Sequence, residues 1–214
     1  MNFPANINPA SIQQELTRDW PARLQIHIAE KAGKSVLLRT DHEGPLRVQR
    51  PFYPEANGCC HVYLLHPPGG VVVGDKLQIT ARVSSRAQAL LTTPSAGKFY
   101  GARDQAFAQC QSVGFNIEDG ACLEWLPQET IIFNSARARL ETRIHLQGSA
   151  LFFGWEMVRL GRIASGEHFL SGSCLQNLAL WRDGVPLFME KNKITPVRII
   201  LELFNPAVYG SPAR

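Results

Sequence analysis

The chain has 214 residues, of which 45% are apolar and 19% charged, an ordinary soluble composition that can bury a hydrophobic core. Its net charge of +4 is small and its basic residues are scattered, which argues against a nucleic-acid partner. No run approaches the roughly 18 apolar residues of a membrane span, and the N-terminus lacks the features of a signal peptide. We therefore expect a cytoplasmic protein without a membrane partner.

The predicted elements are mostly short strands. The first element along the chain is a short helix over 10–18, with Ser11 as its cap. Strands are then expected at 23–28, 35–40, 46–49, 61–66, 76–83, 87–93, 105–111, 121–126, 130–133, 139–147, 149–154 and 174–181. A second short helix is predicted over 154–161, between the last two strands.

Alternation of apolar and polar residues identifies the clearest strands. In 76–83 one face holds Leu77, Ile79, Ala81 and Val83. In 139–147 one face holds Leu140, Thr142, Ile144 and Leu146. Both patterns are typical of half-buried strands, and turn-forming pairs such as Asn57-Gly58 and Asp183-Gly184 separate the strands. The sequence therefore predicts an all-β (mainly β) fold, either a sandwich or stacked sheets. No linker or repeat divides the chain, so we expect a single domain over 1–214.

A stretch rich in proline and glycine over 64–77 raises the question of a phosphate-binding loop. Gly69 and Gly74 have the separation of that motif, but Asp75 stands where its lysine must be and would repel a phosphate. The stretch also leads into a strand, so no helix N-terminus is available for an anion. The residues themselves favour a rigid turn, in which prolines fix the entry and glycines permit positive φ.

The chain contains no template of a known catalytic site. The motifs H-E-x-x-H, G-x-S-x-G and G-x-G-x-x-G are all missing from the sequence. Five cysteines, with one adjacent pair and no Cys-x-x-Cys, predict free, mostly buried thiols in a reducing compartment. Cys122 or Cys174 would be a nucleophile only beside a histidine, and the sequence does not place one there.

The six histidines do not indicate a metal centre. They are spread along the chain, and none lie four apart on a predicted helix. His61 and His66 lie five apart, which puts them on opposite faces of a continuous strand. We therefore expect no tight metal site and no tightly bound cofactor.

Carboxylates in apolar or glycine-rich surroundings are of greater interest, namely Glu124, Glu129, Glu156 and Glu167. Removing a carboxylate from water is costly, so such groups are usually paired, hydrogen-bonded or in contact with an ion. Oxygen ligands of this kind would hold a divalent ion loosely. An alternative is a β-rich hydrolase that uses Glu124 with Glu129, or Glu156 with Glu167, as a carboxylate pair. A further alternative is that each carboxylate is hydrogen-bonded or solvated without a function.

Several short motifs follow one another between about residues 20 and 190. They occupy 44–55, 60–70, 74–75, 91–94, 98–100, 123–129, 154–156, 160–162 and 165–167. Their most characteristic residues are His66, Pro67, Pro68, Gly69, Gly70, Gly74, Lys98, Phe99, Tyr100, Trp125 and Gln128. In their order and spacing these motifs resemble the UreD family (also called UreH) of urease accessory proteins.

The resemblance implies a fold of stacked β-sheets in a β-helix-like arrangement with one or two short helices. It implies a scaffold and chaperone rather than an enzyme, which docks on apo-urease with the accessory protein UreF and, through UreF, with the GTPase UreG. It also implies that Ni²⁺ passes transiently through a polar passage in the protein. The candidate passage residues are Asp75 and Glu156, followed by Thr92, Glu124, Glu129 and Glu167. Such a conduit must bind an ion weakly enough to release it.

Residues 191–214 depart from the family pattern. Family members usually continue further, so the chain resembles a UreD with a shortened or atypical C-terminus. A β-layer that loses strands exposes an edge and apolar area. A truncated, inactive remnant of a UreD is therefore another alternative.

Overall fold

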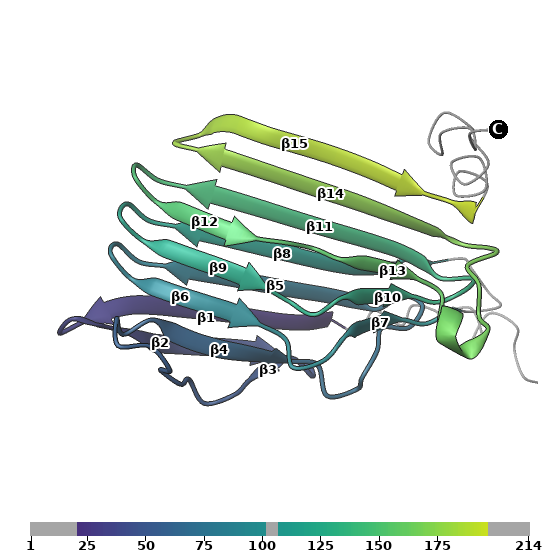
Figure 1. The fold of residues 1–214 in the computed structure, drawn as a ribbon, viewed down its shortest axis with the longest axis horizontal. Helices are drawn as coiled ribbons and strands as arrows, with labels where there is room; N and C mark the ends of the chain where they lie inside the picture. The colour runs from purple at the N-terminus through teal and green to yellow at the C-terminus, as the bar shows by residue number, and fades with distance from the viewer. Residues whose placement is uncertain (1–20, 102–106, 197–214) are drawn as a thin grey trace, which may run out of the picture.

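The computed structural model describes residues 21–101 and 107–196, and the fold is all-β, as predicted (Figure 1). The strands are β1 (Pro21–Lys31), β2 (Lys34–Glu43), β3 (Arg47–Val48), β4 (Cys60–Leu65), β5 (Lys76–Val83), β6 (Gln88–Thr92), β7 (Gly97–Phe99), β8 (Gln109–Ile117), β9 (Cys122–Leu126), β10 (Thr130–Ile132), β11 (Arg137–Leu146), β12 (Leu151–Gly154), β13 (Val158–Leu160), β14 (Ser173–Arg182) and β15 (Val185–Ile194). A short 3₁₀ helix covers Ile163–Ser165.

The strands form three sheets. The long sheet has the order β15-β14-β11-β8-β5-β1-β2, the middle sheet β12-β9-β6-β4-β3, and the short sheet β13-β10-β7. Figure 1 shows the middle sheet in front of the long sheet, with the short sheet continuing beside it. Antiparallel hairpins, β1 with β2 and β14 with β15, close the two edges of the long sheet.

The chain winds from sheet to sheet in repeated coils. β5, β6 and β7 contribute one strand to each sheet in turn, and β8 to β10 and β11 to β13 repeat that path. Strands of successive coils pair in parallel within each sheet, as β5 with β8 and β6 with β9 do. This winding confirms the predicted β-helix-like arrangement.

Alternation of side chains places the hydrophobic core inside the coils. In β11, Leu140, Ile144 and Leu146 are buried, whereas Arg139 on the other face is exposed. Phe115 of β8 is fully buried and contacts Trp125 of β9 edge-on, with ring centroids 5.4 Å apart. The core therefore joins the long sheet to the middle sheet, as the period-two patterns predicted.

Several sequence predictions need correction. The predicted helix over 154–161 is wrong: β12 ends at Gly154, and Val158–Leu160 form β13. The Thr130 amide donates to the Met157 carbonyl at 2.8 Å, so this backbone bonds to the neighbouring strand instead of to itself. The strand predicted over 105–111 begins at Gln109 and continues to Ile117, while residues 105 and 106 lie outside the described part.

Three strands have no predicted counterpart. β7 and β13 have three residues each, too few for a periodic pattern, and β15 lies partly in the stretch set apart as atypical. β15 forms an edge of the long sheet and exposes large apolar side chains, namely Val185, Leu187, Phe188 and Met189. The helix predicted over 10–18 and residues 197–214 lie outside the described residues.

All five cysteines are free thiols, in agreement with the sequence prediction. Across 21–101 and 107–196, no helix has the length and apolar character needed to cross a membrane.

Candidate functional site

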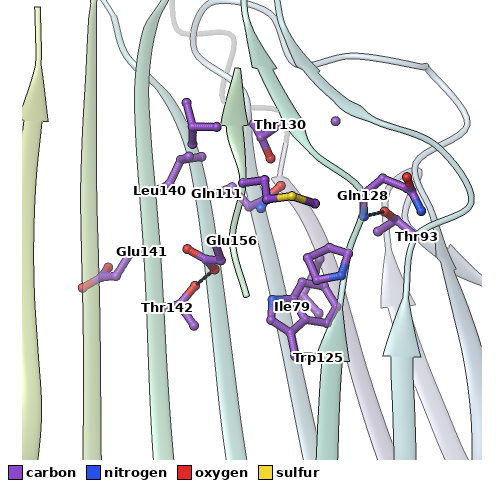
Figure 2. A pocket seen from close by; sticks show the side chains of 14 residues that line it. Ile79, Thr93, Gln111, Trp125, Gln128, Thr130, Leu140, Glu141, Thr142 and Glu156 are labelled. Carbon is purple, nitrogen blue, oxygen red and sulfur yellow. Dashed lines mark hydrogen bonds between the residues drawn. The ribbon is translucent and has the colours of Figure 1, made fainter. Parts of the chain in front are cut away.

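A small cavity with several polar side chains in a partly apolar wall lies close to the turns that join the middle sheet to the short sheet (Figure 2). We call it the inner cavity. It has a volume of about 60 Å³, enough for a few water molecules or a partly hydrated ion. Its walls carry carboxylate, hydroxyl and amide groups from Glu156, Thr93, Thr130, Thr142, Gln111 and Gln128. Ile79 and Leu140 of the long sheet form part of its apolar wall.

Glu156 provides the carboxylate of the inner cavity. It lies in the connection between β12 and β13, and its carboxylate accepts a hydrogen bond from the hydroxyl of Thr142 on β11 (Figure 2). Thr142 is 2% exposed, because it occupies an inward position of the alternating strand. Glu156 as a whole residue is exposed, but its carboxylate is turned into the cavity wall, where loss of water raises its pKa and the hydrogen bonds of Thr142 and Trp125 oppose this rise.

Trp125 brings a buried indole N–H to the same cavity. The residue is 3% exposed, and its Nε1 makes no hydrogen bond of normal distance and angle, although this N–H acts on the Glu156 carboxylate and lowers its pKa. Buried polar atoms are nearly always hydrogen-bonded, so a donor that is only weakly engaged favours a polar neighbour in the cavity. The inner cavity can therefore receive a small polar or charged species.

A second, larger cavity adjoins the inner one. It has a volume of about 380 Å³ and is lined largely by 64–67, 69–71 and 93–99, so we call it the loop cavity. Ile79, Thr93, Gly97 and Gln111 line both cavities. Because four residues are shared, the two cavities are immediate neighbours in the interior.

The proline- and glycine-rich stretch forms one wall of the loop cavity, which makes it a structured turn as the residues predicted. Gly69 has φ of +78°, in agreement with the expected positive φ. Gly70 has a different role, since a Cβ atom there would lie 2.1 Å from the Tyr100 ring. Tyr100 in turn packs against Phe133, with ring centroids 4.8 Å apart. Of the other motif residues, His66, Pro67, Lys98 and Phe99 line the loop cavity, and Trp125 and Gln128 line the inner cavity.

Asp75 stabilises the turn at the end of this stretch. Its Oδ2 accepts a hydrogen bond from the Val72 amide at 2.9 Å. Asp75 lines neither cavity, but it faces His66, which does. Burial lowers the pKa of His66, and the negative charge of Asp75 acts in the opposite direction.

Thr92, Glu124 and Glu129 line neither cavity. Thr92 donates its hydroxyl hydrogen to the Leu126 carbonyl at 2.5 Å. Glu124 is on β9, one residue before the inward Trp125, and therefore faces away from the core. Glu129 lies between β9 and β10, where its carbonyl accepts from the Gly97 amide at 2.9 Å. The structure thus brings Glu156, but not these three, into a cavity wall.

Glu167 closes a turn on the surface side of the short sheet. It accepts hydrogen bonds from Arg162 Nε at 2.5 Å and from the Asn134 amide at 3.0 Å. Burial acts to raise its pKa, but the hydrogen bonds and the Arg162 charge outweigh burial, so its pKa is lowered. Its contacts are those of an ionised carboxylate that stabilises a turn.

The described residues do not provide the carboxylate pair that the hydrolase alternative requires. Neither Glu124 with Glu129 nor Glu156 with Glu167 shares a cavity wall in the described structure. Glu141 also borders the inner cavity, but its carboxylate points away from Glu156 and bonds to Arg143 at 2.5 Å (Figure 2). The geometry therefore lacks two facing carboxylates around an open cleft.

Sequence reasoning missed most of the polar cavity wall. Gln111 lies in register with Leu77 and Leu140, two buried residues of the adjacent strands. Thr142 was assigned to the inward face of its strand but was not considered as a site residue. A polar residue at an inward position of an alternating strand was the available signal in both cases.

Comparison with known proteins places this geometry in context. A family model described as UreD urease accessory protein matches residues 21–211. A protein of Saccharophagus degradans named urease accessory protein UreD is 57% identical over 177 residues, which cover 83% of this chain and 60% of the relative.

Two further relatives carry the same name. The protein of Chromohalobacter salexigens is 45% identical over 188 residues, covering 84% of this chain and 60% of the relative. The protein of Hahella chejuensis is 42% identical over 185 residues, covering 86% and 59%. The chain thus spans about 60% of the length of these relatives.

Proposed function

The chain belongs to the UreD family of urease accessory proteins, and we propose that it is a scaffold and chaperone of urease maturation rather than an enzyme. In this proposal it docks on apo-urease together with UreF, binds UreG through UreF, and helps to deliver nickel to the urease active site. Its free thiols are consistent with a reducing, cytoplasmic location. These three relatives are all named as urease accessory proteins, and the chain covers about 60% of their length.

The observation that carries the nickel proposal is the pair of neighbouring cavities. The loop cavity reaches the His66 turn, the inner cavity reaches Glu156, and Gln111 and Thr93 line both. The shared lining residues support a route through the coils. We propose that nickel moves along this route as cargo.

The chemistry of the inner cavity suits an ion in transit. Apart from Glu141, whose carboxylate is directed away and bonds to Arg143, the polar side chains that line it are one carboxylate, three hydroxyls and two amides, from Glu156, Thr93, Thr130, Thr142, Gln111 and Gln128. Oxygen ligands of this kind hold a divalent ion less firmly than thiolate and imidazole ligands do. A cation beside Glu156 would favour its charged form and so offset the effect of burial on its pKa. Weak binding at several sites permits both entry and release.

Replacing Glu156 tests this assignment. With urease, UreF and UreG co-expressed, Glu156→Gln should lower nickel-dependent urease activation roughly tenfold, because it removes the carboxylate of the inner cavity. Recovery of UreF and urease with the variant should be unchanged. The matched control is Glu43→Gln, since Glu43 is exposed on β2, is paired with Arg23 at 3.2 Å and lines neither cavity.

Equal urease activation by the Glu156→Gln and Glu43→Gln variants would show that Glu156 has no role in the nickel passage. Asp75→Ala is a second variant, expected to act indirectly through the turn and through His66, because Asp75 faces His66 without lining a cavity. Its effect on activation should therefore be smaller than that of Glu156→Gln.

A further inference from the structure

Three residues with metal-binding side chains converge outside the two cavities. Glu55 and Cys59 lie in the connection that leads into β4, and His61 is the second residue of β4; their ligand atoms all lie within 4.8 Å of one another. Phe52 and His61 pair as an antiparallel bridge, so the chain between them doubles back and brings Glu55 toward His61. The cluster combines a carboxylate, a thiol and an imidazole, each a common ligand of transition metals.

Local contacts fix this arrangement. The Cys59 amide donates to Asn57 Oδ1 at 2.9 Å, which holds the turn before the thiol. The His61 ring contacts the Phe52 ring, with centroids 5.3 Å apart. Glu55 Oε1 and His61 Nε2 are 3.1 Å apart. The imidazole and carboxylate are therefore already at the separation expected of neighbouring ligands.

The cluster is buried except on the side of Glu55. Cys59 is 6% exposed and His61 7%, whereas the Glu55 side chain is 49% exposed. An ion could thus enter beside Glu55 and meet the buried thiol and imidazole. Three protein ligands with one accessible side leave a fourth position for water or a donated ligand.

We propose that Glu55, Cys59 and His61 form a binding site for one divalent transition-metal ion of the Zn²⁺ or Ni²⁺ class. In a tetrahedral site with metal–ligand distances of about 2.0–2.3 Å, ligand atoms lie about 3.3–3.8 Å apart. The largest separation here exceeds that range by about 1 Å at most, and small side-chain rotations on binding would close this gap. The thiol excludes Mg²⁺ and Ca²⁺, which prefer oxygen ligands.

The surroundings of the site are electronegative. Burial, followed by the nearby carboxylates Glu55 and Glu124 and the thiols Cys60 and Cys122, raises the pKa of Cys59 to about 12. This inference extends beyond the proposed passage and does not depend on it, because none of the three ligands lines either cavity.

Metal titration of the 214-residue chain tests the site. Ni²⁺ and Zn²⁺ are added separately as simple salts, binding is measured by calorimetry, and Co²⁺ or Ni²⁺ absorption reports a thiolate-to-metal charge-transfer band. We expect one equivalent to bind with that band present. Cys59→Ser should abolish the band, and Glu55→Gln should keep the band but weaken binding at least about tenfold.

Matched controls separate this site from others. Cys110→Ser changes another free, partly exposed thiol, and Glu43→Gln changes another exposed carboxylate, so both should leave metal binding intact. Glu55→Gln alters an exposed side chain and keeps the test valid if Cys59→Ser fails to fold. No saturable binding, or binding and band unaffected by both Cys59→Ser and Glu55→Gln, would overturn the proposal. Binding lost only in Glu156→Gln would place the metal in the inner cavity and overturn the proposal while leaving the passage intact.

Discussion

At the scale of single residues, two glutamates of one motif series have opposite environments. Glu156 is an exposed residue whose carboxylate turns to Thr142 and Trp125 in the wall of the inner cavity, and loss of water there raises its pKa. Glu167 bonds to Arg162 and to the Asn134 amide at a turn, and these partners lower its pKa despite burial. The environment, rather than the residue type, decides which of the two can respond to a passing cation.

The pH dependence of stability should differ in sign between these two glutamates. Because the pKa of Glu156 is raised above 4.5, its contribution to stability is complete below that pH and is lost as pH rises through the raised pKa. Glutamine stays neutral, so Glu156→Gln should gain stability relative to the unsubstituted chain between acidic and neutral pH. Urea denaturation at both pH values measures the difference. A constant difference would mean that Glu156 is not desolvated.

Glu167→Gln should behave in the opposite way. Its lowered pKa gives stability that is present above the ordinary carboxylate pKa and is lost as pH falls through the lowered value. The variant should therefore be less stable at neutral pH by roughly 1–2 kcal/mol, since it loses charge-assisted hydrogen bonds. The same urea series should show this deficit shrinking on acidification. A deficit that grows on acidification would contradict the assigned ion pair with Arg162.

The sequence predicted some site residues and missed others for a physical reason. The environment of Glu156 depends on Thr142 of β11, a contact between strands that local patterns do not encode. Glu124 sits one position from Trp125, so period two alone puts it on the opposite face. The sequence did not predict the cluster of Glu55, Cys59 and His61. Their spacing along the chain does not show that the backbone reverses direction between Phe52 and His61, which is what brings them together.

At the scale of elements, hydrogen bonds between turns help to stack the coils. Glu118, after β8, accepts from Arg82 Nε at 2.6 Å and from the Ser85 amide at 3.0 Å. Asp119 accepts from the Ser149 amide at 2.7 Å. These carboxylates connect turns of successive coils that lie 30 or more residues apart in the chain. Side-chain hydrogen bonds between turns therefore add to the backbone hydrogen bonds between the parallel strands.

β11 offers a direct test of the inward and outward faces. Ile144 is 2% exposed and Arg139 lies on the opposite, exposed face. Ile144→Ala should lower the free energy of unfolding by about 2–5 kcal/mol, because it leaves a cavity in the core. Arg139→Ala should change it by no more than about 0.5 kcal/mol. Equal effects in chemical denaturation would contradict the assigned register.

Strand prediction succeeded where burial on one face enforced alternation. The predicted strand 76–83 coincides with β5, and 139–147 overlaps β11 closely. It failed at 154–161, where β13 exists because its backbone pairs with β10 rather than because of its own pattern. β7 has only three residues, and its pairing with β10 likewise comes from the coil. Parallel neighbours therefore determine the elements that local sequence leaves undefined.

At the scale of the whole molecule, the coils hold two adjoining cavities, each partly open to the surface. The winding brings the His66 turn and Glu156, separated by many residues, to the walls of neighbouring spaces. Membership of the UreD family rests on a match over 21–211 and on relatives up to 57% identical. The β-helix-like arrangement could be expected from the motif resemblance, whereas the cavities depend on side-chain volumes that only the assembled fold reveals.

The most direct test of the central proposal is urease activation in a strain that lacks its own UreD. The 214-residue chain is co-expressed with urease, UreF and UreG and purified, and the eluate is assayed for bound partners and for nickel-dependent urease activity. The account predicts that UreF and urease co-purify with the chain and that activity appears. A folded chain that recovers neither partner and restores no activity would contradict the proposed function and favour an inactive remnant.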